Sequence, residues 1–114
     1  MNQYKSGLSG EAQAEAYLLD QGMTTVTTRY RGADGEIDLI MREGDVLVFV
    51  EVKFRPSANK GAGLITVTPA KQQRILHAAQ SFLFEMNEMD HLIRFDVVEI
   101  TRDGLIHIPN AFGA

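Results

Sequence analysis

The sequence has no cysteine, no tryptophan and no apolar run near the roughly 20 residues that a membrane-spanning helix needs. Without cysteine there are no disulfides, no thiolate zinc sites and no cysteine nucleophiles, which suits a reducing cytoplasm. The polar opening MNQYKSG lacks the pattern of a signal peptide. We therefore expect a cytoplasmic protein that does not enter a membrane.

One stretch of the chain lacks acidic residues altogether. The net charge is -4, which by itself argues against a nucleic-acid partner, because phosphate binding leaves a basic footprint. Residues 52–84, however, contain five basic side chains and no acidic one, and they follow directly after an acidic region. This arrangement is typical of a site that meets a polyanion through a metal ion, although a solvated loop and helix would explain it too. The five basic residues are Lys53, Arg55, Lys60, Lys71 and Arg74.

Two helices are predicted from caps and apolar spacing. Ser9 caps a helix that ends at Gly22, and Thr68 caps a second helix with Pro69 in its first turn. Residues 57–67, which precede the second helix, are expected to form an irregular loop. We expect the buried stripes to contain Ala12, Ala16 and Leu19 in the first helix and Ile75, Ala79, Phe82 and Met86 in the second.

Five strands are predicted from alternation and turn residues, at 24–30, 36–41, 46–54, 91–100 and 105–108. Pro109 is expected to close the last strand, as at an edge. The apolar run Val46–Val50 indicates a central strand that is covered on both faces. The order αβββαββ predicts a single α/β domain over residues 1–114, with a mixed central β-sheet flanked by α-helices and one functional site.

Charged residues end the two most apolar strands, in GEIDLI and VFVEVKFR. Asp38 lies across from Glu51 if the loop between these strands has an even number of residues, and on the other face if the loop is odd or bulged. Carboxylates that face each other repel and raise each other's pKa unless a cation holds them. Mg²⁺ or Mn²⁺ is the simplest such cation, because one or two carboxylates plus water and phosphate oxygens satisfy it.

This arrangement suits metal-assisted hydrolysis of a phosphodiester. Lys53 would orient the attacking water or stabilise the charge that develops on the phosphate. The plain alternative is that Glu51 and Lys53 form an ion pair at a strand end while Glu36 and Asp38 are only solvated. Glu11 and Glu15, one helical turn apart, are candidates to complete the metal shell, and Lys71 and Arg74 are candidates to hold phosphates, although solvated surface charge explains each pair as well.

Other catalytic patterns find no support in the sequence. The three histidines, His77, His91 and His107, have no metal-ligand spacing. Gly61-Ala-Gly63 lacks the third glycine of a dinucleotide-binding motif, and no serine occupies a G-x-S-x-G elbow.

The two charged strand ends resemble the signature of the restriction-endonuclease-like, or PD-(D/E)XK, superfamily. More closely, the chain resembles the YraN family of small bacterial proteins, which is grouped with Holliday junction resolvase-like nucleases. The likeness spans nearly the whole chain and rests on GEAQAEAYL, GEIDLI, FVEVKFR, residues 71–79, RFDVVEI and IPNAF.

The resemblance implies a restriction-endonuclease-like fold in which Asp38 and Glu51 are metal ligands and Lys53 is the water-orienting residue. It also implies Glu11 as an additional helix-borne acid. Gly35 and Glu36 match the family motif, and the resemblance leaves the role of Glu36 open.

We therefore expect a Mg²⁺- or Mn²⁺-dependent nuclease acting on DNA, branched or damaged DNA included, with Arg55, Lys60, Lys71 and Arg74 contacting the nucleic acid and Glu36 and Glu15 in supporting roles. A homodimer would let such an enzyme cut two strands symmetrically. Two alternatives remain, a non-catalytic nucleic-acid-binding module and a protein-interaction domain.

Overall fold

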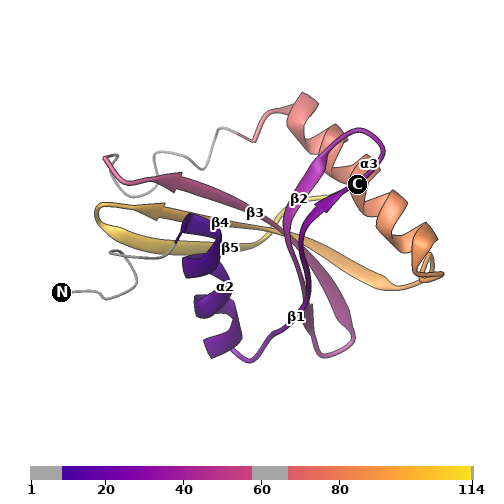
Figure 1. Ribbon diagram of the computed structural model, residues 1–114, viewed down its shortest axis with the longest axis horizontal. Coiled ribbons are helices and arrows are strands. Elements are labelled where there is room, and N and C mark those ends of the chain that lie inside the picture. Colours follow the sequence, from indigo (N-terminus) through magenta and orange to yellow (C-terminus); the bar gives the residue numbers. More distant parts are fainter. Residues whose placement is uncertain (1–8, 58–66, 114) are drawn as a thin grey trace.

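The computed structural model describes residues 9–57 and 67–113, which form two helices and five strands. The order αβββαββ confirms the prediction from the sequence (Figure 1). The predicted loop at 57–67 falls almost entirely on residues 58–66, outside the described residues, and so does Lys60. In chain order the elements are α2 (Gly10–Asp20), β1 (Thr24–Arg31), β2 (Glu36–Glu43), β3 (Val46–Arg55), α3 (Pro69–Glu85), β4 (Leu92–Thr101) and β5 (Gly104–Phe112).

The five strands make one mixed sheet in the order β1-β2-β3-β4-β5. Neighbouring strands are antiparallel except for β3 and β4, which run parallel from Val46↔Leu92 to Arg55↔Thr101. Parallel neighbours need a crossover connection, and the chain segment that contains α3 provides it. The central position predicted for the third strand is therefore confirmed.

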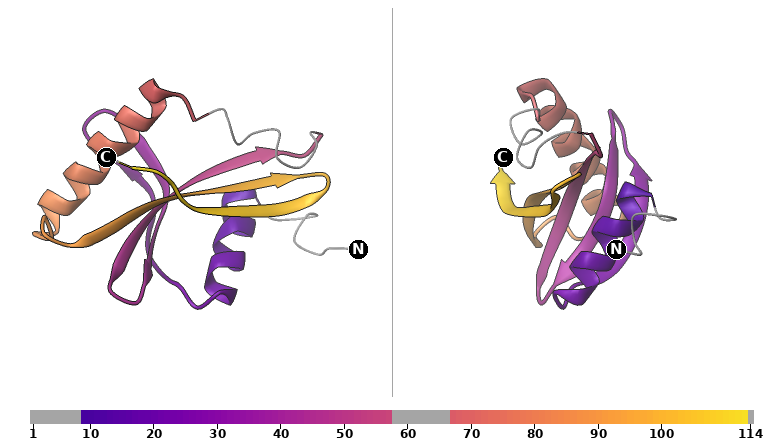
Figure 2. Two further views of the ribbon diagram at one scale, coloured as in Figure 1. Left: turned by 180° about the vertical axis from the view of Figure 1, so that it is seen from behind. Right: turned by 90° about the vertical axis from the view of Figure 1, so that its left-hand side faces the viewer.

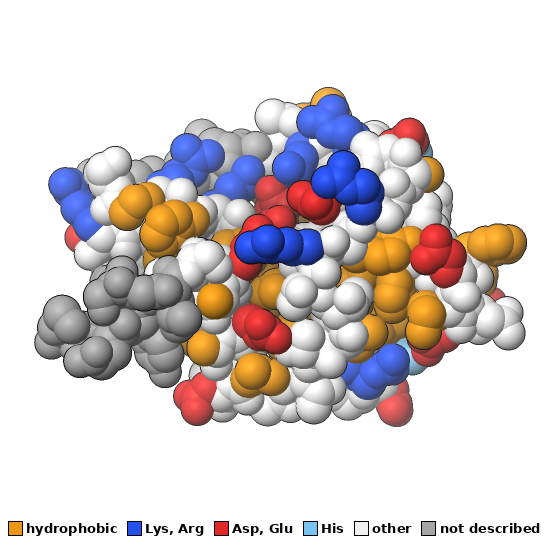
Figure 3. Space-filling view, in the orientation of Figure 1, with side chains coloured by type: hydrophobic (Ala, Val, Ile, Leu, Met, Phe, Trp, Pro, Cys, Tyr) orange, Lys and Arg blue, Asp and Glu red, His pale blue; other side chains and the backbone are white. Residues whose placement is uncertain are grey.

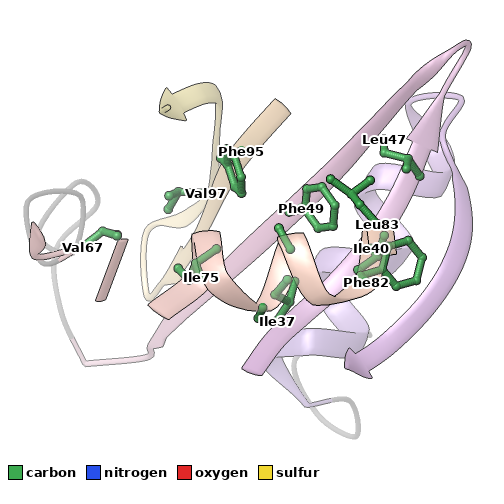
Figure 4. Close-up of a cluster of buried hydrophobic side chains, with 12 residues drawn as sticks. Ile37, Ile40, Leu47, Phe49, Val67, Ile75, Phe82, Leu83, Phe95 and Val97 are labelled. Carbon is green, nitrogen blue, oxygen red and sulfur yellow. The ribbon is translucent and has the colours of Figure 1, made fainter. Parts of the chain in front are cut away.

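The two helices lie on opposite sides of the sheet, as the right-hand view of Figure 2 shows. The cluster on the α3 side includes Phe49, Phe82 and Phe95, whose rings pack against one another (Figure 4). The cluster on the α2 side includes Leu18 and Val48. Two covered faces explain why β3 is apolar at consecutive positions.

The caps of both helices are as predicted, but the buried stripe of α2 is not. Ser9 accepts a hydrogen bond from Ala12 N and Thr68 accepts one from Lys71 N. Instead of Ala12, Ala16 and Leu19, the buried residues of α2 are Gly10, Gln13, Ala14 and Leu18.

Compared with the prediction, α2 is rotated about its axis, because it lies very close to β3. A Cβ atom on Gly10 would lie 2.7 Å from the Phe54 side chain, so only glycine lets the helix approach this closely. The contact places the Gly10 side of the helix against the sheet and leaves Leu19 47% exposed. In α3 the prediction fails only at Met86, which follows the last helical residue and is exposed.

The last strand is longer than predicted, because pairing resumes beyond Pro109. The partners on β4 and β5 shift register between Phe95 and Val97, and Asn110 there has a φ of 54°. An irregularity of this kind absorbs a proline that cannot donate to the ladder. Pairing then continues to Phe95↔Phe112, so Pro109 does not end β5.

Asp96, which is fully buried, lies at that irregularity and is surrounded by donors. Its carboxylate accepts from Arg94 Nε and Nη2 at 2.8 and 2.9 Å and from Asn110 N at 3.0 Å, and it contacts His107 Nε2 at 2.7 Å. These partners outweigh burial, so the pKa of Asp96 lies below its usual value of 3.8. Nothing in the sequence analysis anticipated this network.

No helix in the described ranges 9–57 and 67–113 is long and apolar enough to cross a membrane.

Candidate metal and nucleic-acid site

The turn between β2 and β3 decides whether Asp38 and Glu51 face each other. It contains two residues, Gly44 and Asp45, flanked by the pair Glu43↔Val46. Gly44 adopts a φ of 58°, which glycine reaches without strain at the first central position of a tight hairpin turn. The even loop keeps register up to Leu39↔Val50, the last regular pair, and Asp38 and Glu51 are the residues that come next to this pair on β2 and β3.

Regular pairing between β2 and β3 stops at Asp38. Its Oδ2 atom accepts a hydrogen bond of 2.7 Å from Val52 N, so the side chain takes the place of a backbone acceptor. The alternation of faces also breaks here, since Ile37 belongs to the cluster on the α3 side and Leu39 to the cluster on the α2 side. Regular backbone pairing between β2 and β3 therefore ends beside Asp38, where the charge of Glu51 also acts on it.

Asp38 is in an environment that favours its protonated form. Burial is the largest cause and, with repulsion from Glu51 and Glu11, raises the pKa of Asp38 from 3.8 to about 7. The bond from Val52 N and the charge of Lys71 act in the opposite direction but do not compensate. We call Asp38, Glu51 and Glu11 the acidic group.

Glu51 differs from Asp38 because two lysines hold it. Lys53 Nζ and Lys71 Nζ each lie 3.4 Å from Glu51 Oε2, and Glu51 is only 6% exposed. Lys53 comes from the same strand and Lys71 from the first turn of α3, on the face of the sheet that α3 covers. The E-x-K motif thus forms the ion pair that the plain alternative expects, with a second lysine added from the helix.

The remaining predicted acids are placed differently from one another. Glu11, in the first turn of α2, contacts Arg29 Nε at 2.8 Å through Oε1 and also acts on Asp38. Glu15 accepts a hydrogen bond of 2.6 Å from the Thr25 hydroxyl. Glu36 is half-exposed and pairs with Arg31 at 3.3 Å. Glu11 is therefore the helix acid that contributes to the electrostatics of Asp38.

Basic side chains enclose the acidic group. Figure 3 shows acidic side chains surrounded by Lys and Arg in the upper central part of the view, near the start of α3. Lys71 reaches Glu51, whereas Arg55 at the end of β3 and Arg74 on α3 are exposed. The backbone of Arg74 packs closely against Gly35. A Cβ atom added to Gly35 would lie 3.0 Å from the carbonyl oxygen of Arg74.

Arg29 is the site residue that the sequence did not reveal. It lies on β1, has a φ of 51° and pairs with Glu11. A single arginine in a threonine-rich strand carries no motif, and its closeness to the acidic group depends on how β1 and α2 pack. Only the positive φ marks it as unusual, and a sequence does not display backbone angles.

The donors at the site suit a hard divalent cation. Within residues 9–57 and 67–113 no group of three or more His, Cys, Asp or Glu side chains is arranged to hold a metal ion. Mg²⁺ does not need such a group, because one or two carboxylates with water and phosphate oxygens are enough. Two neighbouring carboxylates, one with a pKa raised to about 7, repel each other when ionised, and a bound cation would reduce this repulsion.

The histidines have partners elsewhere. His77 Nδ1 lies 2.7 Å from Asp34, and His107 belongs to the Asp96 network. His91 contacts Arg42 and Glu88 at 3.1 and 3.5 Å.

Comparison with known proteins identifies the family. The model of the Uncharacterised protein family UPF0102 matches residues 10–100. A UPF0102 protein of Saccharophagus degradans is 46% identical over 109 residues, 95% of this chain and 92% of the relative. UPF0102 proteins of Klebsiella pneumoniae and Pectobacterium carotovorum are each 43% identical, over 96% and 98% of this chain and 87% and 97% of the relatives. The chain therefore belongs to the UPF0102 family, the bacterial YraN-like proteins that its motifs resemble.

Proposed function

We propose that this protein is a metal-dependent nuclease that hydrolyses phosphodiester bonds in DNA, branched or damaged DNA included. The observation that carries the proposal is the placement of Asp38, with its raised pKa, beside the lysine-held Glu51 where regular pairing between two core strands ends. Burying like charges together destabilises a fold. A site that does so is a candidate for function.

The same proposal includes a restriction-endonuclease-like fold. The support for it is an acid on β2, an E-x-K sequence on β3 and a crossover through α3 to the parallel strand β4. The acid and the E-x-K sequence on consecutive strands are the signature on which the sequence resemblance rests, and the crossover was expected from the order of the elements.

In the proposed reaction Asp38 and Glu51 would hold Mg²⁺ or Mn²⁺, with Glu11 close by. The bound cation supplies charge stabilisation and a water of lowered pKa. Lys53 Nζ, held 3.4 Å from Glu51, orients the attacking water or stabilises the charge on the phosphate oxygens. The water would give up a proton to solvent as its oxygen bonds to phosphorus, the bond from phosphorus to the leaving sugar oxygen would break, and that oxygen would take up a proton from solvent.

The deciding experiment is cleavage of labelled single-stranded, duplex and four-way-junction DNA with Mg²⁺ or Mn²⁺. Glu51→Gln and Lys53→Met should each lower the rate by about 100-fold or more, because each removes a ligand or a charge from the transition state. Asp20→Asn, an exposed change at the far end of α2, is the matched control and should cut at the wild-type rate. Equal rates in all four proteins would assign the cutting to a contaminant and reject the proposal.

A second candidate function has one observation in its favour. Glu51 is already neutralised by Lys53 and Lys71, so the site is electrostatically tolerable there without a metal. A non-catalytic module would bind nucleic acid through the basic residues, and the acidic residues would bind no metal. DNA binding that depends on salt, needs no metal and survives Glu51→Gln, in a protein that cuts no substrate, would favour this candidate.

A further inference from the structure

Arg29 occupies a position that the proposed chemistry does not yet use. The pairs Thr28↔Leu39 and Tyr30↔Ile37 flank it, so its place on β1 is opposite Asp38. Arg29 on β1 and Glu51 on β3 are therefore the charged residues beside the place of Asp38 on β2. The charge of Arg29 attracts Asp38 and the charge of Glu51 repels it.

The backbone of Arg29 is unusual as well. Its φ of 51° lies in the left-handed region, which side chains other than glycine, asparagine and aspartate rarely enter. Such conformations persist where the surrounding structure enforces them, and they concentrate at functional sites. This second observation is independent of the charges.

The contacts of Arg29 leave most of its guanidinium available. Nε donates to Glu11 Oε1 at 2.8 Å, and within the described part of the chain this is its one hydrogen bond. The Arg29 side chain is 69% exposed. Arg29 and Glu11 also line one surface hollow of about 240 Å³, together with Ser9, Ala12, Glu15, Thr28 and Leu39.

A phosphate would compete effectively with Glu11 for this group. An exposed ion pair contributes little to stability, because water and salt screen it. A guanidinium binds phosphate through two parallel N–H donors, which is a stronger and more directional contact. Glu11 therefore positions Arg29 beside the site through an ion pair that is weak enough for a phosphate to replace it.

We propose that Arg29 is a phosphate-binding residue of the nucleic-acid site. In the absence of DNA its guanidinium pairs with Glu11, and a phosphate of the DNA displaces Glu11. This inference rests on the proposed function and names the residue that meets the substrate backbone. When a phosphate binds Arg29, Glu11 loses its counter-ion beside Asp38. Substrate binding therefore changes the electrostatic environment of the acidic group. Substitutions of the two partners of this ion pair should then change DNA affinity in opposite directions.

The test is metal-free binding, which separates this inference from catalysis. Fluorescence anisotropy with labelled duplex and four-way-junction DNA in EDTA gives Kd at several salt concentrations. Arg29→Asn keeps a residue that tolerates positive φ and removes the charge. It should weaken binding about tenfold and reduce the salt slope by about 0.9, the share of one phosphate contact.

Glu11→Gln should have the opposite effect and tighten binding by about two- to fivefold, since it frees Arg29 from an exposed pair. Glu15→Gln is the matched control: it makes the same charge change one turn along α2 and keeps an acceptor for Thr25. Glu15→Gln should raise the affinity for DNA by less than Glu11→Gln does. In an Arg29→Asn background, Glu11→Gln should raise the affinity by no more than Glu15→Gln does.

The outcomes separate cleanly. DNA binding with unchanged Kd and salt slope in Arg29→Asn would overturn this inference and leave the proposed function standing. Equal gains from Glu11→Gln and Glu15→Gln would overturn the competition between Glu11 and phosphate. Failure of the wild type to bind either DNA in EDTA would overturn this inference, and failure to bind after Ca²⁺ is added as well would overturn the proposed function too. Arg29→Gly, which accepts the same φ, replaces Arg29→Asn if that variant does not fold.

Discussion

Two aspartates, Asp38 and Asp96, show how neighbouring groups decide whether burial raises or lowers the pKa of a carboxylate. Each lies on a core strand where regular pairing is interrupted, and each accepts a backbone N–H from the adjacent strand. Asp96 is fully buried, yet its pKa is lowered, because its bonds with His107 and Arg94 outweigh burial. Burial is the largest cause that raises the pKa of Asp38 to about 7, and repulsion from Glu51 and Glu11 adds to it.

Under the proposed function this difference separates a structural acid from a functional one. Asp96 has its partners within the fold, and the ionised form stabilises that fold. In Asp38, burial and two repelling acids outweigh one backbone donor and the charge of Lys71, so its ionised form is disfavoured. A bound cation would relieve this, as the proposed function requires.

The largest effect should come from removing the charge of Asp96. Asp96→Asn leaves Arg94 and His107 facing an uncharged amide in a buried network. Breaking such a network typically costs about 3–5 kcal/mol. Asp38→Asn should leave the free energy of unfolding unchanged or raise it at pH 7, because it removes a charge that the fold disfavours. Urea denaturation measures both, and equal losses would refute the contrast.

The next effect is a dependence of stability on pH, with a definite sign. The pKa of Asp38 in the folded state is raised, so its favourable contribution is complete below pH 3.8 and is lost as pH rises through about 7. A rise of roughly three units at about 1.4 kcal/mol each gives an upper limit of about 4 kcal/mol. Glu51, Glu11 and Lys71 are the charges that act on it.

Asp38→Asn should remove this loss and flatten the stability curve between pH 4 and 7. Asp96 has the opposite sign, because its contribution is present above the unfolded pKa and is lost as pH falls through its lowered folded value. Denaturation of the wild type and both asparagine variants at several pH values measures these slopes. A wild-type slope that survives Asp38→Asn would contradict the assignment.

A divalent cation should stabilise the folded protein through Asp38 and not through Asp96. At a Mn²⁺ concentration 100 times its Kd, the gain is about 2.7 kcal/mol, and thermal unfolding should show it as a raised Tm. Asp38→Asn and Glu51→Gln should each abolish the shift. Asp20→Asn should retain it, and an unchanged shift in Glu51→Gln would place the cation elsewhere.

The smallest effect concerns how α2 brings Glu11 to Asp38. Gly10→Ala places a methyl group 2.7 Å from Phe54 and should destabilise the fold by about 1 kcal/mol, since Phe54 is half-exposed and yields. The helix would move outward and carry Glu11 away. An NMR titration should then find a lower pKa for Asp38 and the same pKa for Asp96, and an unchanged Asp38 would show that Glu11 contributes nothing.

Much of the fold could be predicted because its signals are local. The Gly44 turn, the caps Ser9 and Thr68, and strand alternation each depend on neighbouring residues. They determined the order of elements and the even loop that brings Asp38 close to Glu51. The buried stripe of α2 could not be predicted, because it depends on the contact between Gly10 and Phe54, 44 positions apart in the numbering.

The candidate site divides in the same way. Asp38, Glu51 and Lys53 lie on two strands joined by one tight turn, so residues 36–53 predict that they come together only if the loop between the strands is even. Lys71 and Arg29 reach the acidic group from α3 and β1. The Asp96 network needs β5 to continue beyond Pro109, which strand propensity argues against.

By itself, the sequence determined that two carboxylates and a lysine end adjacent core strands, because alternation and turn length act over a few residues. Only the tertiary structure decided which acids receive a counter-charge. Lys71 neutralises Glu51, Arg29 takes Glu11, and Asp38 is left with a raised pKa. The physical reason is that electrostatic interactions depend on distance in space and on burial, and packing sets both.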